Sequence, residues 1–195
     1  MIPQPAERVG VFGGSFDPPH TSHLLLAAYV LSSAPVDRLM IVPTWQHALD
    51  KEATASFEHR VRMCELAFAD LLRVSVSTIE HELAGRSYTL RTLEALGAQL
   101  PRAAFRLVLG ADILEETHRW HRFADVRELA PLIVVGRVGF PVPEGSDPTI
   151  LLPAVSSTDV RQRLARGESV DGLVPARVME YVDAERLYRL PESSA

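Results

Sequence analysis

The strongest constraint on the fold is a repeated alternation of short apolar runs with segments of helical periodicity. The apolar runs are typical of buried strands and lie at Arg8–Phe12, Leu39–Val42, Leu71–Val76, Phe105–Leu109 and Leu132–Val135. Helical patterns separate several of them, at Ser22–Ser32, Glu58–Asp70 and Thr89–Leu100. This alternation predicts parallel strands joined by right-handed crossovers, and hence a Rossmann-like open α/β sheet with helices on both faces.

The chain is expected to form a single domain over residues 1–195, with a core at about 8–153 and a small C-terminal helical appendage at about 154–190. The appendage contains two predicted helices, Ser157–Arg166 and Ala176–Ala184, which are too short to form a hydrophobic core of their own. A Pro- and Gly-rich surface loop at Gly139–Asp147 precedes it. Cys64 is the one cysteine, so no internal disulfide is possible, and a chain of 195 residues can bury a core without one.

Composition and charge exclude several classes of protein. The formal net charge is −5, which argues against a general nucleic-acid binder. The longest apolar run, Leu24–Leu31, is far shorter than the roughly 18 residues of a membrane span, and Met1–Glu7 does not resemble a signal peptide. We therefore expect a soluble, cytoplasmic protein with no nucleic-acid or membrane partner. The sequence leaves the oligomeric state open, a homodimer included.

A glycine-rich loop follows the first predicted strand and runs directly into a helix, with the sequence GGSFDPPHTSH over residues 13–23. The two glycines allow the backbone to approach a ligand, and the two prolines stiffen the loop. His20 and His23 fall three residues apart at the helix mouth, with Thr21 or Ser22 expected as the N-cap. A helix N-terminus binds anions, so this loop predicts a phosphate site at the carboxyl edge of the sheet.

Five segments, in order along the chain, resemble the bacterial nicotinate-nucleotide adenylyltransferases of the HxGH nucleotidyltransferase superfamily. The loop at 13–20 resembles the opening motif, and VSSTDVR at 155–161 is similar to the C-terminal ISSTxIR motif. Between them lie SYTLRTL at 87–93, Gly110-Ala111-Asp112, and Trp120-His121. Two positions depart from the pattern. Ser22 replaces the glycine of HxGH, and Lys51 stands one residue later than the lysine of the family's P-P-H-K stretch, which suggests a divergent branch.

The resemblance implies transfer of AMP from ATP to nicotinate mononucleotide, giving deamido-NAD and pyrophosphate in NAD biosynthesis. It implies Mg²⁺ as cofactor, held mainly by phosphates and water rather than by protein ligands. It implies His20, His23 and Arg161 as catalytic residues. The implied ATP-binding residues are Gly13, Gly14, Ser15, Phe16, His20, His23, Gly110, Asp112, Ser156, Ser157, Thr158 and Arg161. Those for the mononucleotide are Lys51, Tyr88, Thr89, Trp120 and His121, with Trp120 stacked on the pyridine ring.

Alternatives remain open from the sequence. His20 and His23 could form part of a zinc site, although no third ligand is evident. Trp120 could simply cover the core, the commoner fate of a tryptophan. A related enzyme could act on nicotinamide mononucleotide, a pantetheine phosphate or a choline-type phosphate. A non-catalytic nucleotide-binding relative is also conceivable. Ser22 is expected to cap its helix rather than to touch the nucleotide.

Overall fold

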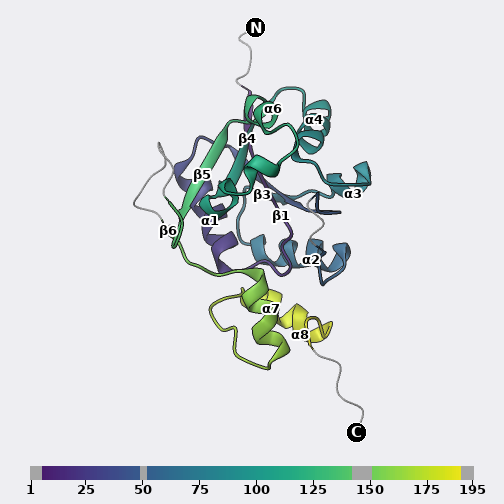
Figure 1. The fold of residues 1–195 in the computed structure, drawn as a ribbon, viewed down its shortest axis with the longest axis vertical. Coiled ribbons are helices and arrows are strands. Elements are labelled where there is room, and N and C mark those ends of the chain that lie inside the picture. The colour runs from purple at the N-terminus through teal and green to yellow at the C-terminus, as the bar shows by residue number, and fades with distance from the viewer. Residues whose placement is uncertain (1–5, 49–51, 142–150, 190–195) are drawn as a thin grey trace.

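The computed structural model describes residues 6–48, 52–141 and 151–189 (Figure 1). Over these residues the strands form one six-stranded sheet in the order β3-β2-β1-β4-β5-β6, and every neighbouring pair is parallel. This arrangement confirms the predicted Rossmann-like open sheet. Within the described ranges no helix is long and apolar enough to span a membrane.

The elements follow the sequence pattern closely in the first half of the chain. The strands are β1 (Glu7–Gly14), β2 (Arg38–Pro43), β3 (Val74–Val76), β4 (Ala103–Gly110), β5 (Leu132–Arg137) and β6 (Leu151–Leu152). The helices are α1 (Thr21–Ser33), α2 (Phe57–Phe68), α3 (Ile79–Leu83), α4 (Thr89–Gln99), α5 (Ala111–Leu114), the 3₁₀ turn η1 (Thr117–Arg119), α6 (Phe123–Leu129), α7 (Ser157–Ala165) and α8 (Ala176–Ala184).

Alternating strand residues divide the core into two layers, one on each face of the sheet. On β2, Leu39 and Ile41 pack into the layer that contains α1 and α2, whereas Met40 and Val42 pack into the layer that contains α4 and α6. This division follows from the two-residue period of a strand, whose successive side chains point to opposite faces. Both faces are therefore covered by helices, as the sequence predicts.

Several boundaries differ from the prediction. The expected strand Leu71–Val76 shortens to Val74–Val76, because Leu72 is 99% exposed in the turn that follows α2. Helix α1 begins at Thr21 with His20 as its N-cap, so neither Thr21 nor Ser22 is the cap. Helix α1 has a side that faces solvent, where Leu25 is 45% exposed. Helices α3, α5 and α6 and strand β6 were not predicted.

The C-terminal helices share the core of the sheet. Val160 of α7 and Val178 and Val182 of α8 belong to the same buried cluster as Met63 and Cys64 of α2. In Figure 1 these two helices lie below the sheet, at the end where α2 lies. They therefore close the edge of the molecule that carries the β1–α1 loop.

One buried carboxylate ties this loop to three other segments. Asp17, 2% exposed, accepts hydrogen bonds from the backbone N–H groups of Thr54 (2.7 Å) and Ala55 (3.0 Å). The hydroxyl of Tyr188, beyond α8, donates to Asp17 Oδ1 over 2.8 Å. Arg161 Nη1 lies 3.6 Å from Asp17 Oδ2. The loop conformation thus depends on contacts with residues far along the chain.

We predict that Tyr188→Phe lowers the free energy of unfolding by about 1–2 kcal/mol, because it leaves Asp17 without one of its donors in a buried site. Urea unfolding measures the effect. Tyr181→Phe is the matched control: it removes the 2.8 Å hydrogen bond between the hydroxyl and His59 Nδ1, which lies nearer the surface, and should cost less. Equal losses in the two variants would contradict the assigned role of Asp17.

Candidate active site at the carboxyl edge of the sheet

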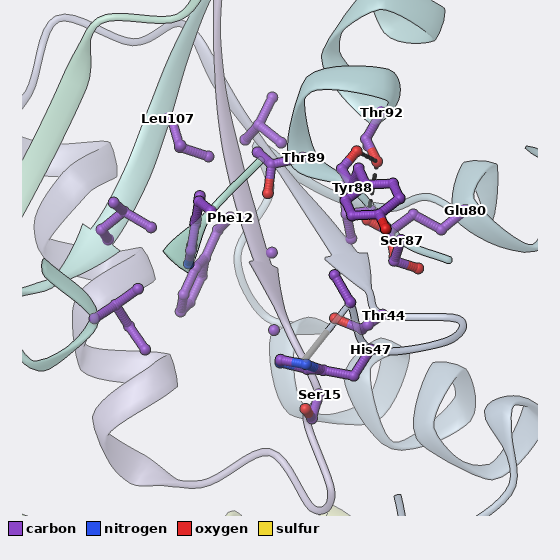
Figure 2. Close-up of a pocket in the computed structure, with 18 of the residues that line it drawn as sticks. Phe12, Ser15, Thr44, His47, Glu80, Ser87, Tyr88, Thr89, Thr92 and Leu107 are labelled. Carbon is purple, nitrogen blue, oxygen red and sulfur yellow. Dashed lines mark hydrogen bonds between the residues drawn. The ribbon is translucent and has the colours of Figure 1, made fainter. Parts of the chain in front are cut away.

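A cavity of about 420 Å³ opens beyond the carboxyl ends of β1, β2 and β4 (Figure 2). The chain leaves β1 toward β2 and leaves β4 toward β5, so strand order reverses here, where ligands bind in open α/β sheets. Backbone of Gly13, Gly14 and Gly110 forms part of its lining, together with the side chains of Thr44 and His47.

The residues predicted to contact the mononucleotide gather in this cavity. Tyr88, Thr89, Trp120 and His121 all line it, and the rings of Tyr88 and His121 lie 5.1 Å apart between centroids. Trp120 also packs edge-on against Phe123 at 5.7 Å, so it covers core with one side and faces the cavity with the other. Lys51 lies outside the described residues.

The N-terminus of α4 is open toward a ligand. Tyr88 is its N-cap and makes no side-chain cap, and the first turn carries no acidic residue. The first backbone hydrogen bond of the helix runs from Thr92 N–H to Tyr88 O over 3.1 Å. The N–H groups of the first turn, which point along the helix axis, therefore have no partner within the helix, and they favour an anion.

The two histidines lie at the start of α1, and neither lines this cavity. Their rings stack with centroids 3.7 Å apart. The backbone N–H of His20 donates to Nδ1 of His23 over 3.1 Å, so that nitrogen is an acceptor and the proton of the neutral ring sits on Nε2. His20 is 4% exposed, and among the described residues no group hydrogen-bonds its Nδ1. A buried polar atom without a partner points to a ligand.

Both imidazoles are held in the neutral state. Burial, and then the charge of Arg137, lower the pKa of His20 to about 3. The pKa of His23 is lowered well below its usual value by burial, then by His20 and Arg137. Each ring can therefore donate one N–H without carrying a positive charge before a ligand arrives.

Arg137, at the end of β5, is a site residue that the sequence analysis missed. Its guanidinium forms an ion pair with Asp112 and donates to the Val155 carbonyl. Its buried Nε has no partner among the described residues. Arg137 therefore joins two segments that the motifs identified separately, Gly110–Asp112 and Val155–Arg161. Only its position at a strand end, without a motif, could have suggested a role.

The Asp112 side chain turns back over Gly110. A Cβ at Gly110 would lie 2.5 Å from Asp112 Oδ1, so only glycine leaves room for this conformation. Because Asp112 pairs with Arg137, its carboxylate is already occupied in this state of the site. In its predicted contact with ATP, Asp112 would have to share its carboxylate oxygens with Arg137.

The C-terminal motif lies against the glycine-rich loop. Ser156 caps α7 by accepting from the Asp159 N–H over 3.1 Å. Ser157 donates to the Pro18 carbonyl over 2.9 Å. Arg161 Nη1 donates to the Asp17 carbonyl over 2.7 Å. The loop and the start of α7 are thus one connected unit.

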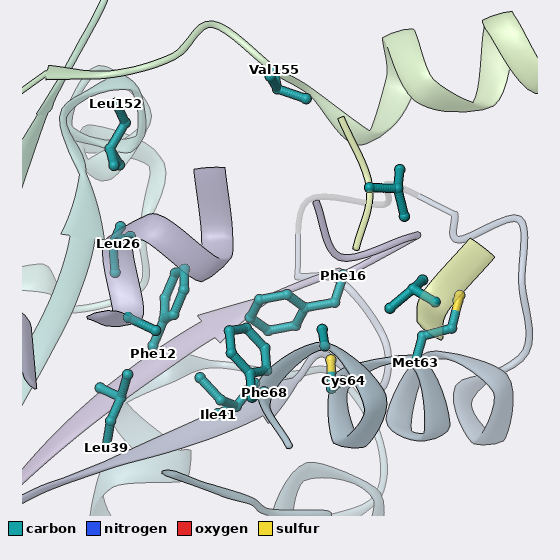
Figure 3. Packing of buried hydrophobic residues seen from close by; sticks show 14 of the residues in the cluster. Phe12, Phe16, Leu26, Leu39, Ile41, Met63, Cys64, Phe68, Leu152 and Val155 are labelled. Atoms are coloured by element: carbon teal, nitrogen blue, oxygen red, sulfur yellow. The ribbon is translucent and has the colours of Figure 1, made fainter. Parts of the chain in front are cut away.

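Phe16 has a different environment from that expected of a nucleotide contact. Its side chain is 1% exposed and lies in the buried cluster with Phe12 and Phe68 (Figure 3). Its ring centroid also lies 4.9 Å from that of His23. Any contact between Phe16 and a ligand must therefore come from its backbone. Its ring packs edge-on against the ring of His23.

Ser22 does not cap α1. Its hydroxyl donates to the Pro153 carbonyl over 2.9 Å, and the residue is 3% exposed. The expectation of a cap is wrong because His20 already occupies the N-cap position. Ser22 instead connects the first turn of α1 to the segment that follows β6.

The donors of the site suit an anion rather than a cation. In the described ranges no group of three or more His, Cys, Asp or Glu side chains is placed to hold a metal ion. The buried atoms without partners are an imidazole nitrogen and a guanidinium N–H.

Comparisons with known proteins agree with this geometry. Residues 11–163 match the cytidylyltransferase-like family, and the chain belongs to that family of nucleotidyltransferases. A probable nicotinate-nucleotide adenylyltransferase of Anaeromyxobacter dehalogenans (strain 2CP-C) is 50% identical over 186 residues, which cover 93% of this chain and 97% of the relative. One of Myxococcus xanthus is 40% identical over 190 residues, covering 96% and 97%. Within the family, the chain belongs to the nicotinate-nucleotide adenylyltransferases.

Solved structures share the fold. A nicotinic acid mononucleotide adenylyltransferase of Plasmodium falciparum, complexed with NaAD, matches with a TM-score of 0.78 at 17% identity. That match covers 93% of this chain and 97% of the Plasmodium chain. A putative nicotinate-nucleotide adenylyltransferase from Vibrio parahaemolyticus matches with a TM-score of 0.71 at 20% identity, covering 95% of this chain and 97% of the Vibrio chain.

The neutral histidines predict a pH-dependent stability. Below pH 6.5 the unfolded chain binds a proton at His20 that the folded chain, with its pKa of about 3, does not bind. Stability should therefore fall as pH falls, by roughly 2 kcal/mol from His20 alone between pH 7 and pH 5. Urea unfolding across this range measures it. His20→Gln should lose correspondingly less stability on acidification, and an unchanged pH slope would contradict the assignment.

The Ser22 hydrogen bond gives a second prediction. Ser22→Ala should lower the free energy of unfolding by about 1 kcal/mol and leave the KM for ATP unchanged, because the hydroxyl is engaged by the Pro153 carbonyl. Ser22→Gly should lose up to about 1 kcal/mol more through backbone entropy. Thermal melts and steady-state kinetics on both variants test this. A several-fold change in the ATP KM at unchanged stability would show that the hydroxyl contacts the nucleotide.

Proposed function

We propose that this protein transfers AMP from ATP to nicotinate mononucleotide, giving deamido-NAD and pyrophosphate. The observation that carries the proposal is the division of one site into two halves at the switch point. One half is a cavity with an aromatic wall and the open N-terminus of α4. The other consists of His20 and Arg137, which do not line that cavity and each have a buried nitrogen without a partner among the described residues. The family and the curated relatives support the same assignment.

The reaction needs alignment more than acid–base chemistry. An oxygen of the mononucleotide phosphate attacks the α-phosphorus of ATP, and the bond from that phosphorus to the pyrophosphate oxygen breaks. A phosphate monoester has its second pKa near 6, so it is already largely dianionic at neutral pH and needs no general base. The protein's contribution is therefore to hold two polyanions in line and to neutralise charge in the transition state.

We assign the phosphate contacts to the half that contains the histidines. His23 presents Nε2–H, because its Nδ1 accepts from the His20 backbone. His20 and Arg137 supply the donors that have no partner among the described residues. Arg161, with Ser156, Ser157 and Thr158, approaches from the C-terminal side, and its place against the Asp17 carbonyl puts it on the glycine-rich loop. Gly13, Gly14, Ser15 and Gly110 supply backbone at the boundary between the halves.

We assign the pyridine nucleotide to the open cavity. Trp120 would stack on the pyridine ring, and the first-turn N–H groups of α4 near Tyr88 and Thr89, with His121, would meet the nicotinate carboxylate. Lys51 is proposed as a contact to the mononucleotide from the segment after β2. Mg²⁺ would arrive with ATP and be held by phosphate oxygens and water. It would reduce the charge of the triphosphate.

Turnover with a panel of acceptors tests the proposal. With ATP and Mg²⁺, nicotinate mononucleotide should give deamido-NAD and pyrophosphate faster than nicotinamide mononucleotide, a pantetheine phosphate or a choline-type phosphate. His20→Ala and His23→Ala should each raise the barrier by roughly 2–4 kcal/mol, the scale of one lost charge-stabilising donor. His118→Ala, an exposed histidine outside the site, is the matched control and should keep full activity. Near-normal turnover in both site variants would contradict the assignment.

A further inference from the structure

A second buried acid lies beside the open cavity and takes no part in the reaction described above. Glu80, on the short helix α3, is 9% exposed and lines the cavity wall (Figure 2). Its neighbour Ile79 is 2% exposed and packs into the core layer of α4, which fixes α3 against the sheet. The carboxylate of Glu80 is thereby held at the base of the wall rather than in solvent.

The Glu80 carboxylate joins the segments that form this wall. Oε2 accepts from the Trp45 backbone N–H over 3.1 Å, in the segment after β2. Oε1 accepts from the Thr92 hydroxyl over 3.0 Å, in the first turn of α4. The Ser87 hydroxyl also donates to this carboxylate. Three separate stretches of chain thus converge on one side chain.

The same stretches carry the groups that face the cavity. Ser87 Oγ also accepts from the N–H groups of Trp45 and Gln46, each over 3.2 Å, and Ser87 N–H donates to Gln46 O over 2.8 Å. Thr44 and His47 flank the first stretch, and Tyr88 and Thr89 follow Ser87 directly. A displacement of the 44–48 segment from α4 would therefore change the width of the cavity.

A purely structural role explains this acid poorly. Burial raises the pKa of Glu80, whereas hydrogen bonds from Ser87, Trp45 and Thr92 oppose that rise. Burial thus disfavours the charged carboxylate, and the three donors offset part of that cost. An apolar residue would fill the same space without that conflict. A fully hydrogen-bonded buried carboxylate, by contrast, fixes the geometry of every group that donates to it.

We propose that Glu80 is a positioning residue for the mononucleotide half of the site. It holds the 44–48 segment against the first turn of α4. In this way it sets the distance between these two walls of the cavity, between which the pyridine nucleotide binds. This inference rests on the proposed function for the identity of the ligand. Glu80 has no contact with ATP in this assignment, because other elements form the half of the site that binds the ATP phosphates.

Kinetics and binding with Glu80→Gln test the inference, with Glu82→Gln as the matched control. Glu82 lies on the same helix but is exposed. In Glu80→Gln, the KM and the calorimetric Kd for nicotinate mononucleotide should rise by roughly tenfold, while the KM for ATP stays unchanged. Glu82→Gln should match the wild type in both. Glu80→Asp, whose shorter side chain cannot span the same donors, should show the same selective loss and provides a second folded variant.

The outcomes separate two kinds of failure. Absence of wild-type turnover with ATP and nicotinate mononucleotide would overturn the proposed function itself. Wild-type turnover with equal increases in both KM values for Glu80→Gln, or with no increase in either, would overturn the positioning role alone. A melting temperature lowered in Glu80→Gln with both KM values intact would likewise assign Glu80 to stability and contradict the inference.

Discussion

Strands β1 and β4 pair in parallel, and the chain leaves their carboxyl ends toward opposite edges of the sheet. Two loops that would otherwise cover the same edge are therefore drawn apart, and a cavity opens between them. Every later feature of the site depends on this divergence. The β1–α1 loop carries the histidines to one side, and the segment after β2 meets α4 on the other.

The two halves prepare for their ligands by different physical means. On the histidine side, imidazoles are kept neutral by burial and by Arg137, so their N–H groups are fixed before any anion arrives. On the α4 side, backbone N–H groups at an uncapped helix end provide a weaker and more open field. Such a division suits a reaction in which one partner carries three phosphates and the other presents a flat ring and a single phosphate.

Local patterns allowed much of this arrangement to be predicted. Strands punctuated by Gly and Pro, and the helices between them, follow from periodicity alone, and the motifs at 13–23 and 87–93 lead to the right edge of the sheet. Features that depend on distant partners could not be predicted. Ser22 bonds to a carbonyl 131 residues away, and strand β6 exists only through its pairing with β5.

Arg137 and Glu80 could not be predicted as site residues for a related reason. Each is an ordinary charged residue in sequence, and its importance arises from burial beside groups that the chain brings together only in the folded state. The predicted strand Leu132–Val135 ended two residues before Arg137, and the segment containing Glu80 had no predicted element. A longer predicted strand would have placed Arg137 at the carboxyl edge of the sheet. No pattern in the sequence indicates that Glu80 is buried.

The hydrogen bond between Tyr188 and Asp17 spans 171 residues of sequence. During synthesis, the β1–α1 loop leaves the ribosome well before Tyr188 is made. The nascent chain can therefore build its sheet while the loop still lacks this donor, and the loop acquires its full set of contacts only after Tyr188 has emerged. Because the entropy of closing a long loop grows slowly with its length, this late closure costs little more than a closure of half the span. A truncation that removes Tyr188 would consequently act on a distant part of the sequence, at the mouth of the first helix.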